Sequence, residues 1–341
     1  MITVLKYLVI LVYWLKMASS KGSAVTTKLI RHRRFWIKRD DLLSTSSGLN
    51  GNKARKFMHM ETMKLPRAIV SYGGHQSNAL HALAKLVDYK RRLGAKSKLT
   101  YYCRALPKWL KTYPVGSFKN AFDLGTCFVE LSDADYDTLA QLESKEASEF
   151  LNLSSSTLFV KQGGACELAR PGTNDLADEI VSDIERLQVE ERELGDVDRP
   201  WKVLIASGTG TTAVYLHERL RSTRSDIKVV AVPCVGSGTY LEQQMAKRAT
   251  DASLPMVLSP VSEHPFGKPR HDLIDIWREI RDPQVDLDFD LVYAPRAFET
   301  ILANLCGELL KDSNIMYYHC GGIEGNESQF RRYERSGLLL R

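Results

Sequence analysis

The chain has 341 residues, enough for two domains or for one large domain with an extensive core. Hydrophobic residues make up 44% of it and charged residues 26%, which excludes a disordered chain and one built mainly of membrane spans. The formal net charge is +6, but no basic stripe alternates with aromatic residues. We therefore expect no nucleic-acid partner and only a slight preference for anionic small molecules.

Residues 1–25 are predicted to form a leader that is first apolar and then flexible. The apolar run over residues 3–15 is too short to cross a bilayer comfortably. Three interpretations remain open: a signal peptide or membrane anchor, a true start of translation at Met17, and an organelle leader. Contact with a membrane is expected only if this run is translated and retained.

The first informative lysine stands where a loop gives way to a helix. A short strand is predicted over residues 35–41, and a loop of Ser, Thr, Asn and Gly over residues 44–51. A helix is predicted over residues 54–65, so Lys53 lies at the junction. An isolated lysine is usually a solvated surface charge. At a rigid junction its amine can instead point into a cleft.

A glycine-rich turn follows the next predicted strand. That strand covers residues 67–72, the turn reads Gly-Gly-His-Gln-Ser-Asn up to Asn78, and a helix is predicted over residues 79–92. Either Ser77 or Asn78 could cap this helix. The elements expected next are strands at 98–103, 127–131 and 157–160, a polar helix at 138–151 and an amphipathic segment at 174–192.

A second turn combines glycine with hydroxyl side chains. It follows a strand predicted over residues 201–205 and precedes a helix predicted over residues 213–220. Its members are Ser207, Gly208, Thr209, Gly210, Thr211 and Thr212. Backbone N–H groups and hydroxyls at a helix start suit a phosphate group. The turn lacks the lysine of a nucleotide phosphate loop and the spacing of a dinucleotide loop, and such a turn can also serve only to bring helix and strand close.

The remaining segments continue the alternation of strands and helices. Strands are expected at 227–233, 291–293 and 314–319, and helices at 239–248, 273–280 and 297–310. This order predicts an α/β fold with mostly parallel sheets and ligands bound at the carboxyl ends of strands.

The six cysteines form no Cys-x-x-Cys pair, and the eight histidines show no metal-ligand spacing. We therefore expect buried thiols, no metal site, and a reducing compartment, either the cytoplasm or an organelle.

Taken in order, four motifs resemble those of one enzyme family: Lys53 with its basic neighbours, the turn up to Asn78, the Ser207–Thr212 turn, and a Cys320-Gly-Gly turn after the last strand. The family is the pyridoxal-phosphate-dependent 1-aminocyclopropane-1-carboxylate deaminases and D-cysteine desulfhydrases. The resemblance implies the tryptophan-synthase-β-like fold, also called fold type II, with two open αβα domains. It also implies a large domain (26–66 and 161–341), a small inserted domain (67–160), an active site between them and a homodimer.

The resemblance also implies roles for individual residues in binding pyridoxal 5'-phosphate. Lys53 matches the lysine that forms the Schiff base, and Lys56 matches the lysine that reaches the phosphate. The Ser207–Thr212 turn matches the phosphate cradle, and Asn78 matches the neighbour of the ring hydroxyl. Without the resemblance to this family, Lys56 could equally be a surface charge on a helix, and Asn78 could be a helix cap.

Further matches concern the amino-acid substrate. Ser77 matches the residue that handles the substrate carboxylate or a proton, and Gln76, Asn78 and Cys320 are placed beside the substrate. Tyr293 matches a tyrosine whose phenol could attack a strained ring or move a proton, although without the family it reads as a core aromatic. His75 and His319 are expected to be structural.

Two positions depart from the deaminase pattern. Ala294 stands where deaminases have a glutamate facing the pyridine nitrogen, and Cys320 stands where they have leucine. Desulfhydrases tend to have a hydroxyl residue at the first position and threonine at the second, so Ala294 matches neither pattern, whereas Cys320 resembles threonine in size. Together the departures weaken the deaminase interpretation more than that of a desulfhydrase converting D-cysteine to pyruvate, sulfide and ammonia. The alternatives are deamination of 1-aminocyclopropane-1-carboxylate to 2-oxobutanoate, a cofactor-binding relative without turnover, and a nucleotide-dependent enzyme that uses the Ser207–Thr212 turn.

Overall fold

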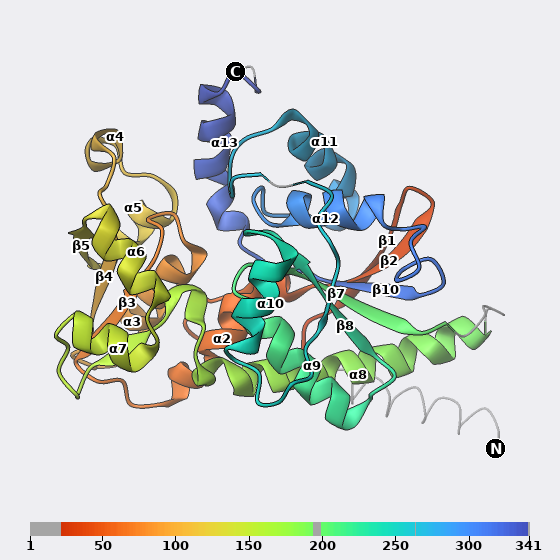
Figure 1. Ribbon diagram of the computed structural model, residues 1–341, viewed down its shortest axis with the longest axis horizontal. Helices are drawn as coiled ribbons and strands as arrows, with labels where there is room; N and C mark the ends of the chain where they lie inside the picture. Colours follow the sequence, from red (N-terminus) through yellow and green to blue (C-terminus); the bar gives the residue numbers. More distant parts are fainter. Residues whose placement is uncertain (1–21, 194–198, 263, 340–341) are drawn as a thin grey trace.

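The computed structural model describes residues 22–193, 199–262 and 264–339. The apolar run at residues 3–15 and the start at Met17 lie outside these ranges. Strands and helices alternate within them, and the strands form two separate sheets (Figure 1). The predicted α/β class with mostly parallel sheets is confirmed.

The larger sheet has six strands in the order β1-β2-β10-β7-β8-β9. All neighbouring strands are parallel except β1 and β2, which form an antiparallel pair at one edge. The strands are β1 (Val25–Ile30), β2 (Arg33–Lys38), β7 (Trp201–Ser207), β8 (Lys228–Pro233), β9 (Met256–Val257) and β10 (Asn314–Tyr318).

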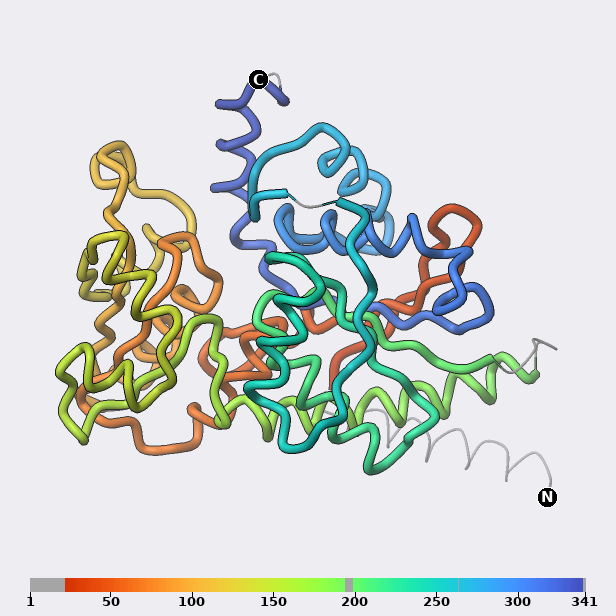
Figure 2. The backbone as a smooth tube through the Cα atoms, in the orientation of Figure 1, coloured from red at the N-terminus to blue at the C-terminus, as the bar shows by residue number. Residues whose placement is uncertain are grey.

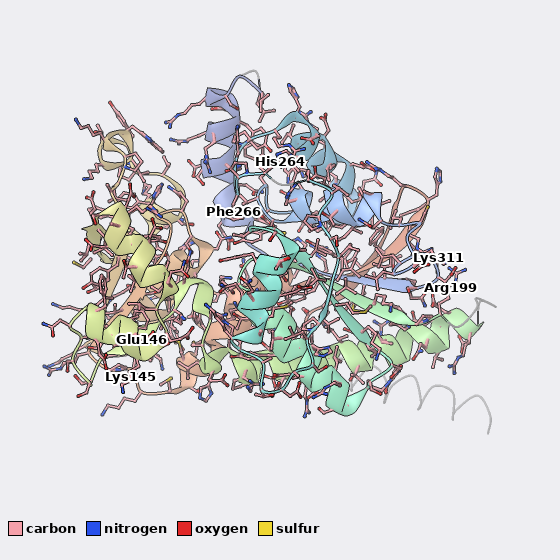
Figure 3. The ribbon with its side chains drawn as sticks, viewed as in Figure 1. Lys145, Glu146, Arg199, His264, Phe266 and Lys311 are labelled. Atoms are coloured by element: carbon pink, nitrogen blue, oxygen red, sulfur yellow. The ribbon has the colours of Figure 1, made fainter. Side chains whose placement is uncertain are left out.

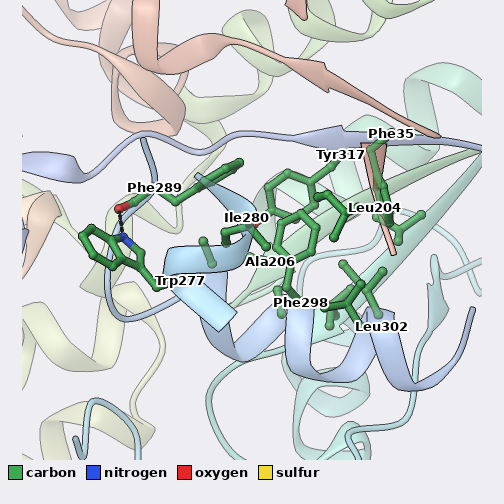
Figure 4. Packing of buried hydrophobic residues seen from close by; sticks show 14 of the residues in the cluster. Phe35, Leu204, Ala206, Trp277, Ile280, Phe289, Phe298, Leu302 and Tyr317 are labelled. Atoms are coloured by element: carbon green, nitrogen blue, oxygen red, sulfur yellow. Dashed lines mark hydrogen bonds between the residues drawn. The ribbon is translucent and has the colours of Figure 1, made fainter. Parts of the chain in front are cut away.

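Helices cover both faces of this sheet, so its central strands are buried on both sides. Alternate side chains of one strand enter different cores: Leu204 of β7 packs with α11 and α12, and its neighbour Val203 packs with α8 and α9. Figure 4 shows the first core, where the indole of Trp277 donates to the Phe289 carbonyl at 2.8 Å. The helices are α8 (Arg170–Glu193), α9 (Thr211–Thr223), α10 (Gly238–Ala246), α11 (His271–Ile280) and α12 (Ala294–Ala303).

The smaller sheet has four parallel strands in the order β5-β4-β3-β6. With its helices it forms the left-hand part of Figure 1, and the tube in Figure 2 enters and leaves this part once each. The strands are β3 (Ala68–Tyr72), β4 (Lys98–Arg104), β5 (Cys127–Leu131) and β6 (Leu158–Val160). The helices are α3 (Asn78–Arg92), α4 (Lys108–Thr112), α5 (Gly116–Asp123), α6 (Asp133–Gln141) and α7 (Ser144–Phe150). The predicted domain boundaries themselves stay a prediction.

Helix α2 (Gly51–Thr62) lies between the two sheets and packs against both α3 and α8. Phe57 and Met60 are buried in the core of the smaller sheet. On the other side, the Arg55 guanidinium pairs with Asp40 at 2.9 Å and with Glu179 of α8 at 2.6 Å. Buried ion pairs of this kind fix orientation more than they add stability. They hold the first turn of α2 in one position against the larger sheet.

Three predicted elements are wrong. The helix expected at 138–151 is two helices, because Glu143 and Glu146 form a capping box that starts α7 after a break. The segment expected as a strand at 291–293 is a bend that leads into α12, which ends at Ala303 rather than at Leu310. The bend has a local cause: the Asp290 carboxylate accepts from the backbone N–H groups of Val292, Tyr293 and Ala294.

The expectation that the thiols are buried is also wrong in part. All six cysteines are free, but only Cys103 and Cys234 are buried, and Cys127 and Cys306 are exposed. No group of three or more metal-binding side chains is found in the part of the chain that the structure describes. No helix there is long and apolar enough to cross a membrane.

Candidate active site

One cavity of about 930 Å³ opens between the two sheets and α2. Phe266, which lines it, is labelled in Figure 3 near the meeting of the two parts. Every residue that the sequence predicted for the site lines this cavity. These are Lys53, Lys56, Gln76, Ser77, Asn78, Ser207, Gly208, Thr209, Gly210, Thr211, Thr212, Tyr293 and Cys320. Their individual roles stay predictions.

Lys53 projects from the first turn of α2, which starts three residues earlier than predicted. The Asn52 N–H donates to the Cys320 carbonyl at 2.9 Å, and Gly51 has a φ of +60°. A Cβ on Gly51 would lie 2.3 Å from the same carbonyl oxygen, so only glycine allows this approach. The contact joins the start of α2 to the turn after β10.

The amine of Lys53 has no hydrogen-bond or ion-pair partner among the described residues, and it faces the cavity. Burial lowers its pKa below the usual 10.5, and the nearby Cys320 and Asp290 oppose this change. A lysine with a lowered pKa holds more of its amine in the neutral, nucleophilic form at neutral pH.

The Ser207–Thr212 turn joins β7 to α9 as predicted. Gly210 has a φ of +69°, and the first backbone bond of α9 runs from the Val214 N–H to the Gly210 carbonyl at 2.9 Å. The earlier N–H groups of the turn have no acceptor within the helix. Because these groups lie at the positive end of a helix, the turn suits an anionic group.

Two contacts tie this turn to its surroundings. The hydroxyls of Thr209 and Thr211 lie 3.0 Å apart, and the Thr212 hydroxyl donates to the Asn52 side-chain oxygen at 2.7 Å. The second contact fixes the turn beside the residue that precedes Lys53.

Lys56 lies one helical turn after Lys53 and is buried. Its amine donates to the Gly163 carbonyl at 3.0 Å. Burial lowers its pKa, and the positive charge of Lys53 lowers it further. Both lysines line the cavity, and an anion bound there would relieve the repulsion between their charges.

The turn before α3 places three polar side chains on the opposite wall. Ser77 caps α3 by accepting from the Ala79 N–H at 3.2 Å, so the cap is Ser77 and not Asn78. Asn78 abuts the turn after β10, where a Cβ on Gly322 would lie 2.5 Å from its amide nitrogen. Gln76 donates to the Val115 carbonyl at 3.1 Å, and its side-chain oxygen is buried without a donor.

Tyr293 faces the Ser207–Thr212 turn across the cavity. A Cβ on Gly208 would lie 3.3 Å from the Tyr293 hydroxyl, so a side chain there would fill the space beside the phenol. The phenol also packs edge-on against Phe266, with ring centroids 5.0 Å apart. Burial raises the pKa of Tyr293, which keeps the hydroxyl protonated.

Ala294 is buried in the core and is not among the residues that line the cavity. A carboxylate from the same segment does line the cavity, that of Asp290, four residues earlier. Burial raises the pKa of Asp290, and the hydrogen bonds from Tyr293 and Val292 oppose this change. Sequence reasoning missed Asp290 because it read this segment as a strand. The Pro295 that opens α12 is a helix-start signal that could have identified the capping carboxylate.

The turn after β10 contributes Cys320 to the cavity and keeps His319 behind it. Burial raises the pKa of Cys320 to about 12, so it lines the cavity as a neutral thiol. His319 stacks on Phe289 with centroids 4.5 Å apart. Its Nδ1 accepts from the Gly321 N–H at 3.0 Å, and its Nε2 lies 2.5 Å from the Asp288 carbonyl. His319 therefore holds the turn in place, as expected for a structural residue.

A comparison with models of protein families finds no match, and a comparison with curated protein sequences finds none either. Solved structures do resemble the chain. An ACC deaminase homologue is 18% identical, with a TM-score of 0.67 over 91% of this chain and 94% of its own. A hydrogen sulfide-producing enzyme from Fusobacterium nucleatum is 12% identical, with a TM-score of 0.57 over 89% and 96%. A pyridoxal 5'-phosphate-dependent aspartate racemase is 16% identical, with a TM-score of 0.52 over 88% and 90%.

These similarities extend over nearly the whole of each chain. They confirm the tryptophan-synthase-β-like fold predicted from the motifs. At such low identity they establish the fold and leave the substrate open.

Proposed function

We propose that this chain is a pyridoxal-phosphate-dependent lyase or deaminase of a small amino acid. The observation that carries the proposal is the 2.7 Å hydrogen bond from Thr212 to Asn52. It joins a turn suited to phosphate to the residue preceding Lys53, a cavity-facing lysine whose amine has no partner among the described residues. One cofactor bearing both an aldehyde and a phosphate matches this pair of features.

The donor set fits pyridoxal phosphate. The Lys53 amine is the group to which the aldehyde would be attached, and the hydroxyls and N–H groups of the Ser207–Thr212 turn would hold the phosphate. Gly208 leaves room for a ligand between this turn and Tyr293, since a Cβ there would lie 3.3 Å from the phenol oxygen. When bound, the cofactor supplies an electron-accepting ring that acidifies the Cα proton of an amino acid.

The chain's own residues would bind the substrate and move its protons. The Ser77 hydroxyl and the first turn of α3 offer donors for the substrate carboxylate. Lys53, with its lowered pKa, is suited to take the Cα proton once its amine is free. For ring opening, the protonated Tyr293 phenol can also supply a proton to the substrate from the other side of the cavity.

We favour D-cysteine as the substrate. With one water molecule it would give pyruvate, sulfide and ammonia. Cys320 leaves more room beside the substrate than a leucine would, and Ala294, in the core, offers no carboxylate to the cavity. This lack is consistent with an elimination that depends less on a protonated ring nitrogen.

Ring opening of 1-aminocyclopropane-1-carboxylate to 2-oxobutanoate and ammonia is the second candidate. The position of the Tyr293 phenol over the cavity favours it, because that reaction needs a group that attacks or protonates a ring carbon. A cofactor-binding relative without turnover is a third candidate, favoured by Ala294. We also expect a homodimer, which sedimentation would test.

The decisive experiment is to reconstitute the protein with pyridoxal phosphate and record its visible absorption. Release of 2-oxo acid is then assayed over a panel of D- and L-amino acids, with Lys53→Ala as control. We expect a yellow protein that releases pyruvate from D-cysteine, and a Lys53→Ala protein that does neither. A yellow wild type without 2-oxo acid release would favour the non-catalytic relative, and turnover unchanged in Lys53→Ala would contradict the mechanism.

A further inference from the structure

Helix α13 (Asn326–Arg335) forms one wall of the cavity. It is the dark blue helix beside α4 in Figure 1. Two of its arginines line the cavity, Arg332 and Arg335. The Arg335 guanidinium lies over the ring of Trp109 from α4, 4.1 Å from its centroid. This cation–π contact occupies Arg335 and closes one side of the cavity.

Arg332 is in a different position. The only hydrogen bond of its guanidinium within the described ranges runs from Nη1 to the Gln329 side-chain oxygen at 3.4 Å, and no carboxylate pairs with it there. The neighbouring Arg331 pairs with Glu327 at 2.8 Å on the outer surface of the same helix. Arg332 thus brings an uncompensated positive charge to the cavity mouth.

Arg332 is exposed, and its guanidinium lies beside neutral groups. Gln329 is itself fixed by donating to the Gly267 carbonyl at 3.0 Å. A Cβ on Gly267 would lie 3.1 Å from Arg332 Nη1, so the absence of a side chain leaves space for the guanidinium. The guanidinium is therefore positioned by neutral neighbours that do not cancel its charge.

His75 and Arg332 both line the cavity. Burial lowers the pKa of His75, and the charge of Arg332 lowers it further. The imidazole is therefore neutral near pH 7 and able to donate one hydrogen bond. His75 belongs to the same turn as Ser77, where the substrate is expected, and Arg332 lines the same cavity.

The acidic groups of the cavity are already engaged. Asp290 accepts from three backbone N–H groups, and Glu324 accepts from the Asn50 amide at 2.7 Å. Neither pairs with an arginine in the described part of the chain. The proposed cofactor would occupy Lys53 and Lys56, which leaves Arg332, like Lys85, as a positive charge of the cavity available to the substrate.

We propose that Arg332, assisted by His75, binds negative charge on the side chain of the substrate. This inference rests on the proposed function and names its substrate class: amino acids whose β-substituent is anionic or departs as an anion. D-cysteine belongs to this class because its sulfur leaves as hydrosulfide. Substrates with a permanent negative charge on that substituent bind more tightly than neutral ones of the same shape.

The test uses aspartate and asparagine, which have nearly the same shape and differ by one charge. Each enantiomer of both is titrated into the protein reconstituted with pyridoxal phosphate, and dissociation constants are measured by calorimetry. Three proteins are compared: the wild type, Arg332→Gln, and Arg331→Gln as a control that removes the same charge from the outer surface. Thermal melting verifies that both variants fold.

We expect the wild type to bind aspartate about fivefold more tightly than asparagine in at least one enantiomer, the upper range for an exposed ion pair. Arg332→Gln should bind the two ligands equally, and Arg331→Gln should keep the wild-type preference for aspartate. High salt should reduce that preference. Arg332→Lys keeps part of the ratio because it keeps the charge. Any of three results would overturn the proposal. The wild type binds aspartate and asparagine with equal affinity, it binds neither, or Arg332→Gln weakens the binding of both ligands by the same factor. The last result would assign Arg332 to the α-carboxylate.

Binding is measured here without turnover, so the two proposals fail separately. If no amino acid yields a 2-oxo acid but the charge preference depends on Arg332, only the proposed reaction is wrong. If pyruvate is released but the wild type does not distinguish aspartate from asparagine, only the role of Arg332 is wrong.

Discussion

The Thr212 hydroxyl donates to the Asn52 side-chain oxygen at 2.7 Å, although the two residues are 160 positions apart in the chain. Thr212 lies in the first turn of α9, directly after the loop that follows β7, and Asn52 precedes Lys53 at the start of α2. This bond joins the proposed phosphate cradle to the proposed reactive lysine. The spacing between the two depends on it.

Substitution of Thr212 by valine keeps the shape of the side chain but removes the donated hydrogen bond. We expect the cofactor to bind about tenfold more weakly, since a hydrogen bond of this kind contributes about 1 kcal/mol and Asn52 loses its partner. Titration of the apoprotein with pyridoxal phosphate, followed by absorbance, measures this. Thr223→Val, in the last turn of the same helix, is the control and should bind as the wild type does. Equal affinity in all three proteins would mean that the bond does not position the cradle.

Tyr293→Phe separates the two candidate reactions. If the phenol attacks or protonates the strained ring, this variant loses about 10²-fold or more of 2-oxobutanoate release, as expected for loss of a general acid. Pyruvate release from D-cysteine, which does not need that step, should remain within about fivefold of the wild type. Tyr240→Phe, an exposed tyrosine of α10, controls for general effects. An equal decrease of both reactions would show that Tyr293 only shapes the cavity.

Asp290 provides a test of the electrostatics around Lys53. Its negative charge opposes the lowering of the Lys53 pKa by burial, so Asp290→Asn should lower that pKa further. Only the neutral amine reacts with an aldehyde, so the rate of cofactor attachment should reach half its maximum below pH 10.5 in the wild type. In Asp290→Asn the midpoint should move lower still, by up to about one pH unit.

The matched control for this measurement is Asp282→Asn, which alters a helix cap outside the cavity. It should leave the midpoint unchanged. A midpoint at higher pH in Asp290→Asn than in the wild type would show that Asp290 does not raise the pKa of Lys53.

His81 makes the fold sensitive to acid. It is buried on α3, and burial lowers its pKa to about 4, with the charge of Lys85 adding to the effect. The unfolded chain, with a histidine pKa near 6.5, binds this proton more readily, so stability falls as the pH decreases from 6.5 to 4. The loss between pH 7 and pH 5 should be about 2 kcal/mol.

Denaturant unfolding at the two pH values measures this loss. His81→Gln should lose about 2 kcal/mol less than the wild type over the same range. His59→Gln, at an exposed position on α2, should behave as the wild type does. An acid response that is unchanged in His81→Gln would assign the sensitivity to other groups.

The parts of the site that follow a regular pattern could be predicted from the sequence. An apolar strand, a turn of Gly, Ser and Thr and a following helix identify the Ser207–Thr212 turn, because each feature is local. Lys53 could be identified because loop and helix signals meet at that residue. The start of α2 was placed three residues too late, since the contact of Gly51 with Cys320 is a tertiary one.

Other features depend on packing between distant segments. Arg332 reads as one more charge on an amphipathic helix, and only the position of α13 over the cavity distinguishes it from Arg331. Asp290 was missed because apolar residues around it suggested a strand, whereas its carboxylate turns the chain into α12. Ala294 stands at the position where deaminases have a glutamate that faces the pyridine nitrogen, and the packing of α12 buries it in the core.

The central claim is that the Lys53 amine carries the cofactor. Reconstituted protein is reduced with borohydride, which makes the link between amine and aldehyde permanent, and the digested peptides are analysed by mass spectrometry. We predict one phosphopyridoxyl group, located on the peptide that contains Lys53, and no such group in Lys53→Ala. A label located on Lys56 or on any other lysine, or no label on the wild type, would contradict the account.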